Sequence, residues 1–171
     1  FGIIAVDGTN GLPTVYGQEC QSPLPVCQNS LSVGNPGYSA FGNSCDFGSF
    51  LNCLLSGERA SAFYSIPINA AGNLEFDIVP NDWLGAPSTT STDYDFAIWE
   101  VGASGLQCNQ LGSTAPVRCN YSALGVTGLS GTGNSPGAYP GFNGAYEPAI
   151  AVVPGQVYLL MVSNYTNSTS G

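Results

Sequence analysis

Alternation of apolar and polar residues with a period of two is the feature that most constrains this chain. Large apolar side chains recur at every second residue in runs covering 64–68, 74–78 and 94–98. Successive side chains of a strand point to opposite faces, so each run presents one face to a core. Helical periodicity is almost absent, and only Phe50–Leu55 predicts a helical turn. The pattern predicts an all-β protein, an antiparallel β-sandwich of jelly-roll type.

Turn residues between the runs suggest how the strands connect. Pro154-Gly155 separates two apolar runs at 148–153 and 156–163, which predicts a hairpin. Ala71-Gly72-Asn73 lies between the runs at 62–68 and 73–79 and predicts an antiparallel meander. The stretch 125–144 is rich in Gly, Ser, Thr, Asn and Pro, so it predicts a long surface loop.

The cysteines indicate the compartment. There are six of them and no C-x-x-C pair: Cys20, Cys27, Cys45, Cys53, Cys108 and Cys119. Without any histidine the spacing does not suggest zinc. An even set predicts three disulfides and an extracellular or other oxidising location, and buried free thiols in a cytosolic protein are the alternative. Cys108 and Cys119 bracket a short segment between two strand-like runs, so we expect them to pair.

Charge excludes several classes of function. The chain has eleven acidic residues, two arginines and no lysine or histidine, for a net charge of −9. Nucleic-acid binding and attraction to anionic membranes both need clustered cations. No apolar run is long enough for membrane insertion. Serine is abundant, but no histidine is present to activate it, so we expect no catalytic residues and no enzyme activity.

Two groups of residues are candidate binding sites. Asp82, Asp93 and Asp95 lie at the ends of two predicted strands, where hard oxygen ligands are able to converge on Ca²⁺. The alternative is that Asp82 and Asp93 bond backbone amides at turns. Trp83 and Tyr139 are candidates for stacking against a carbohydrate, although aromatic residues of a sandwich also serve as core. Apart from Ca²⁺, no cofactor is expected.

A colinear series of short segments adds a resemblance. The segments are Pro25-Val26-Cys27-Gln28, Ser56-Gly57-Glu58, Gly72-Asn73-Leu74-Glu75-Phe76, Asp93-Tyr94-Asp95-Phe96, Arg118-Cys119-Asn120-Tyr121-Ser122 and Ser163-Asn164-Tyr165. In this order they resemble a β-sandwich module of large surface proteins of gliding Bacteroidetes that the type IX secretion system exports. That module is itself similar to bacterial pre-peptidase C-terminal domains. The resemblance covers roughly 19–171 and leaves 1–18 as an N-terminal strand and linker.

The resemblance implies a non-catalytic module of a long cell-surface or filamentous protein that serves adhesion or gliding motility. Such modules continue with a closing apolar strand beyond the point where this chain ends. The chain instead opens with an apolar run, in which Phe1, Ile3, Ile4 and Val6 have the character of that strand. Because an unpaired edge is unfavourable, we expect this run to fill the edge of a neighbouring module.

The expected partners are therefore copies of the chain itself, or tandem modules of the same protein, repeated head to tail. Three alternatives remain. The run fills the edge of its own module, the chain is a lone secreted domain, or it is a carbohydrate- or calcium-binding accessory domain of a secreted enzyme, with surface glycans as partners.

Overall fold

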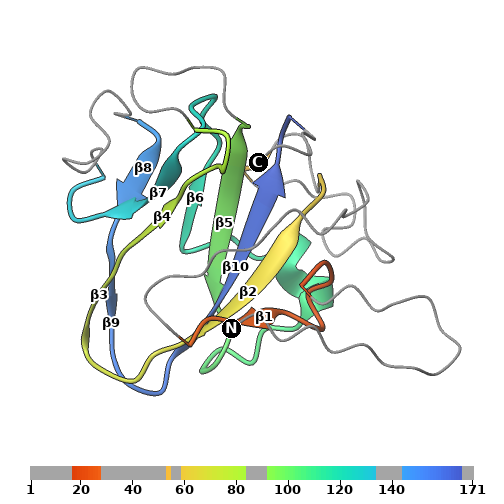
Figure 1. The fold of residues 1–171 in the computed structure, drawn as a ribbon. Helices are drawn as coiled ribbons and strands as arrows, with labels where there is room; N and C mark the ends of the chain where they lie inside the picture. The colour runs from red at the N-terminus through yellow and green to blue at the C-terminus, as the bar shows by residue number, and fades with distance from the viewer. Residues whose placement is uncertain (1–16, 28–52, 55–58, 84–91, 134–143, 167–171) are drawn as a thin grey trace, which may run out of the picture.

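A five-stranded sheet forms the centre of the molecule (Figure 1). The computed structural model describes residues 17–27, 53–54, 59–83, 92–133 and 144–166. In spatial order the sheet contains β1 (Leu24–Pro25), β2 (Ala62–Pro67), β10 (Val157–Asn164), β5 (Tyr94–Glu100) and β6 (Arg118–Asn120). Strand β1 runs parallel to β2, and the other neighbours are antiparallel.

A second, narrower layer covers one face of this sheet. At one end β3 (Gly72–Leu74) pairs with β9 (Ile150–Val152), and farther along β4 (Phe76–Ile78), β7 (Thr127–Ser130) and β8 (Tyr146–Pro148) lie side by side. Glu75 alone separates β3 from β4, and Ala149 alone separates β8 from β9. Two ribbons, 72–78 and 146–152, thus pair at one end and spread apart at the other, where β7 inserts between them. The all-β sandwich is confirmed, with β7 and β8 forming a second parallel pair.

Gly128 allows β7 to approach β4 closely. A Cβ atom at this position would lie 2.0 Å from the backbone oxygen of Phe76, and the φ of Gly128 is 154°. Any larger residue would push the two strands apart, so this contact requires glycine.

Both faces of the central sheet are buried. On one face, side chains of β5 and β10 pack against the second layer; they include Phe96, Ile98, Tyr158, Leu160 and Val162. On the other face Phe63, Ala97, Trp99, Leu159 and Met161 pack against a covering layer of irregular segments, which contributes Cys20, Leu54 and Leu111. The alternation in the sequence therefore predicted only one of the two buried faces, because the residues between the alternating apolar positions are buried as well.

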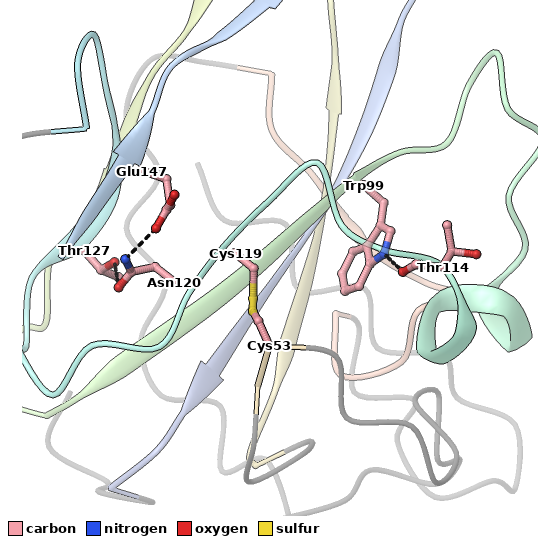
Figure 2. The surroundings of a disulfide bond; sticks show 7 residues. All are labelled: Cys53, Trp99, Thr114, Cys119, Asn120, Thr127 and Glu147. Carbon is pink, nitrogen blue, oxygen red and sulfur yellow. Dashed lines mark hydrogen bonds between the residues drawn. A yellow bond between two sulfur atoms is a disulfide. The ribbon is translucent and has the colours of Figure 1, made fainter. Parts of the chain in front are cut away.

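Two disulfides attach the covering layer. Cys20 bonds to Cys108, the first residue of the 3₁₀ helix η1 (Cys108–Ser113), and Cys53 bonds to Cys119 in β6 (Figure 2). The expected pairing of Cys108 with Cys119 is wrong, because η1 carries Cys108 under the sheet toward Cys20. The indole Nε1 of Trp99 donates to the backbone oxygen of Thr114 at 2.9 Å and fixes the chain after η1.

The other two cysteines are Cys27 and Cys45. Cys27 is exposed and has no disulfide partner among the described residues, and Cys45 lies outside them.

Both predicted turns connect the two layers instead of forming hairpins. Strand β9 pairs with β3, whereas β10 pairs with β2 and β5, so the turn at Pro154-Gly155 carries the chain between layers. Its Gly155 N–H donates to the backbone oxygen of Ile68 at 2.9 Å. Likewise, 68–71 leads from β2 in one layer to β3 in the other. The hairpin and the meander were wrong because the same turn residues serve hairpins and sandwich corners.

Two further local predictions differ from the structure. The stretch 125–144, predicted as a loop, contains β7, whose residues Thr127–Leu129 are buried; the strand is too short for its alternation to stand out. Of the predicted helical turn at Phe50–Leu55, only 53–54 are described, and they are not helical. Helix η1 occurs elsewhere, after a reciprocal cap between Gln107 and Gln110. Among the described helices, none has the length and apolar character to cross a membrane.

Candidate functional site

The two layers differ in width, so among the described strands one flank of the sandwich is open. Contacts between the layers run from β7 to β5 and from β8 to β6. The ring of Phe76 in β4 meets that of Phe96 in β5 edge to face, with centroids 5.4 Å apart. Within the described part of the chain, β2 has no comparable strand opposite it in the second layer.

Six apolar side chains line this flank and are each only partly buried. Tyr64, Ile66 and Ile68 lie in β2 or directly after it, and Leu74, Phe76 and Ile78 lie in the 72–78 ribbon. We call this set the open flank. Their neighbours deeper in the same core, such as Phe96 and Ile98, are fully buried. The flank is therefore a stripe of core that none of the described strands covers.

A free backbone edge borders the open flank. In the described residues β3 pairs only with β9 and β4 only with β7, so the outer side of 72–78 carries no ladder. This ribbon contains no proline. By contrast, β1 has two residues, and its Pro25 has no N–H to donate. The 72–78 ribbon is the edge best suited to accept another strand.

The opposite flank is closed by side chains (Figure 2). Arg118 Nε donates to the backbone oxygen of Pro148 at 3.0 Å. Asn120 Nδ2 donates to the backbone oxygen of Gly144 at 3.1 Å and to Glu147 Oε1 at 3.0 Å. Buried Thr127 lies beside Asn120, with the two side-chain oxygens 3.4 Å apart. Among the described residues these bonds join β6 to β8 where no backbone ladder does.

A second feature is a polar end on the other face of the central sheet. Asp95 is the second residue of β5 and Asp93 directly precedes the strand, so the alternation of an extended chain directs both side chains to the same face. Asp95 is only 2% exposed and lies opposite Ser163 of β10. Burial raises the pKa of Asp93 to about 6. The pKa of Asp95 is raised to about 7, mainly by burial and also by the charge of Asp93. Its hydrogen bond from the Ser122 backbone N–H acts in the opposite direction and lowers the pKa.

Two buried oxygen atoms at this end have no hydrogen-bond partner in the part of the chain that the structure describes. They are Asp93 Oδ1 and Ser61 Oγ. Ser61 is 1% exposed and precedes Phe63 by two residues, so its side chain points to the same face as Asp95. Ser61, Ser163, Asp95 and Asp93 together form what we call the acidic corner.

An exposed rim of one cation and two aromatic rings borders the acidic corner. The Arg59 guanidinium carbon lies 5.0 Å from the Tyr165 ring centre, and Arg59 Nη1 donates to the Tyr165 backbone oxygen at 3.1 Å. The ring of Tyr121 meets that of Tyr165 edge to face at 5.7 Å. Sequence reasoning missed this rim because its residues come from three separated strand ends.

The structure places the other predicted site residues as follows. Asp82 stands apart from the acidic corner: its carboxylate accepts the Thr92 N–H at 3.0 and 3.1 Å and the Thr92 hydroxyl at 3.0 Å. Within the described residues, no three His, Cys, Asp or Glu side chains are grouped closely enough to hold a metal ion by themselves. Trp83 is partly buried against Val126 and Tyr146, in the manner of a core residue.

The remaining candidates cannot be placed. Tyr139 and the predicted inter-module strand, with Phe1, Ile3, Ile4 and Val6, lie outside the described residues.

Comparison with known proteins identifies no relative: no family model, no curated protein and no solved structure matches the chain.

Proposed function

We propose that this chain is a non-catalytic, extracellular structural or adhesive module of a large cell-surface protein or filament. The modules assemble head to tail by strand complementation. The observation that carries the proposal is the free outer edge of 72–78 beside the open flank. Two disulfides support an oxidising location outside the cytoplasm.

The donor strand is Phe1–Val6 of the adjoining module. A strand of six residues spans about 20 Å, which matches the length of the 72–78 ribbon. It adds beside that ribbon and lays alternate apolar side chains over Tyr64, Ile66 and Ile68. Burying an apolar side chain of this size contributes about 1.5–3 kcal/mol, and main-chain hydrogen bonds to the edge add to this.

Surface chemistry agrees with a module made to pack against others. Only 8% of residues are charged, so few long, flexible side chains need to be ordered when two modules meet. The resemblance to modules of type IX-secreted proteins supports the same setting, in which the assembled protein serves surface adhesion or gliding motility. Each module then contributes a rigid unit to a fibre and needs no catalytic residues.

Light scattering after size-exclusion chromatography tests assembly. We expect oligomers of the full chain whose mass grows with concentration, and a monomer for the double variant Ile3→Asp/Ile4→Asp. Val117→Asp is the matched control, because Val117 is 39% exposed and adjoins the opposite edge strand β6. It is expected to assemble like the parent chain. Equal assembly of the parent and the double variant contradicts the proposal, as does a parent chain that stays monomeric at its highest soluble concentration.

A further inference from the structure

We propose that the acidic corner is a binding site for a hard divalent cation of the Ca²⁺ type. Asp93 and Asp95 supply the charged ligands, and Ser163, which pairs with Asp95, and Ser61 lie on the same face of the sheet. The site lies on the face of the central sheet opposite the open flank, so this inference is independent of strand complementation.

The first argument is that negative charge is buried at the corner. Asp95 is 2% exposed, and Oδ1 of Asp93, two residues earlier, is a buried atom with no hydrogen-bond partner among the described residues. Arg59 borders the corner, but its guanidinium lies against the ring and the backbone oxygen of Tyr165, and Arg118 bonds the backbone oxygens of Pro148 and Val117. Burying negative charge without a counter-charge is costly. A bound cation removes that cost.

The second argument is the pair of unsatisfied oxygens. Buried polar atoms in native proteins almost always have a partner. Asp93 Oδ1 and the nine-tenths-buried hydroxyl of Ser61 have none in the described residues, and both belong to this corner. Ser163 Oγ reaches the backbone oxygen of Arg59 only at 3.4 Å, which is a weak bond. A cation at the corner, together with its bound waters, gives these oxygens partners.

The third argument is the kind of donor. The four residues of the corner offer only carboxylate and hydroxyl oxygens, which suit Ca²⁺ and do not suit metals that prefer nitrogen or sulfur. Water completes the six to eight ligands that Ca²⁺ requires. With two carboxylates the site belongs to the weak class typical of extracellular modules, with dissociation constants of about 10⁻⁴–10⁻³ M.

The test uses the full chain, freed of metal with EDTA and then titrated with Ca²⁺ at pH 7.5. At 10 mM Ca²⁺ we expect the Tm to rise by about 3–10 °C. Tb³⁺ is a second probe, because it takes Ca²⁺ sites and its luminescence is excited through nearby tyrosines such as Tyr94 and Tyr165. Asp93→Asn and Asp95→Asn are expected to abolish both signals. Glu75→Gln, an exposed carboxylate on the other layer, is the control and is expected to retain them.

The outcomes are decisive even where a variant folds poorly. A Tm unchanged by Ca²⁺ in the parent chain, together with no sensitised Tb³⁺ luminescence, overturns the site. Binding that survives in Asp93→Asn also overturns it, because Asp93 holds the orphaned carboxylate oxygen. Loss of binding in Asp93→Asn with retention in Glu75→Gln supports it, and circular dichroism confirms that both variants are folded.

Discussion

Removal of the Cys20–Cys108 disulfide gives the largest stability change that the fold predicts. The bond joins residues separated by 88 positions. A cross-link that closes a loop of this length removes unfolded-chain entropy worth about 4.6 kcal/mol. The double variant Cys20→Ala/Cys108→Ala is therefore expected to lose about 4–5 kcal/mol of its free energy of unfolding. The covering layer, to which Leu111 belongs, should loosen over Trp99, since both residues pack in the core cluster that contains Cys20.

The size of the loss distinguishes this pairing from the one expected from spacing alone. Had Cys108 paired with Cys119, the short loop would contribute only about 3 kcal/mol. Urea unfolding of the parent and the double variant, followed by tryptophan fluorescence, measures the difference. Peptide mapping without reduction identifies the partners. A loss of about 3 kcal/mol or less, or a peptide that links Cys108 to Cys119, refutes the covering-layer arrangement.

Three further predictions address other parts of the structure. With EDTA present, the unfolding free energy should fall as pH rises from about 4 to 8. The pKa values of Asp93 and Asp95 are about 6 and 7 in the folded state and 3.8 in the unfolded state, so the folded protein binds more protons over this range. Asp95→Asn should flatten that profile in thermal melts and stabilise the protein by about 2 kcal/mol at pH 8. This value is half of the free energy that corresponds to the full pKa shift, to allow for solvent screening. A pH profile as steep as that of the parent chain would contradict this expectation. Asn120→Ala should cost about 2–3 kcal/mol in urea unfolding because it breaks the closed flank, whereas the exposed Asn109→Ala should cost little; equal losses would show that the flank is not held there. The intact mass should lie six hydrogens below that of the reduced chain, with Cys27 bonded to Cys45 as the third pair, and a deficit of four hydrogens would leave Cys27 free.

The sequence predicts strands and buried faces better than it predicts connections. The alternation at 64–68, 74–78 and 94–98 follows from the pleat, so the inward side chains Ile66, Phe76 and Phe96 were predictable from residue type alone. Which strands pair is a global property. The turns at 69–71 and 154–155 have the residues of hairpins, but the apolar faces beside them are buried only if the chain crosses to the other layer.

For the candidate sites, too, residue spacing predicts local features but not contacts between distant parts of the chain. That Asp93 and Asp95 share a face follows from their spacing, and the structure places both there. Their burial does not follow from the spacing, because Asp95 is buried beside β10, where it pairs with Ser163, and β10 lies far from it in the sequence. The contact of Arg59 with Tyr165 joins residues 106 positions apart, and no local pattern marks it. Asp82 looks equivalent to Asp93 in the sequence, yet Thr92 occupies its carboxylate.

Amide hydrogen exchange along 72–78 tests strand complementation most directly. In the full chain at high concentration, amides on the outer side of this ribbon should exchange slowly, because the Phe1–Val6 strand of another copy accepts their hydrogen bonds. In Ile3→Asp/Ile4→Asp the same amides should exchange rapidly, while those of β10, bonded on both sides, stay protected. Outer amides that exchange equally fast in both proteins would contradict the account.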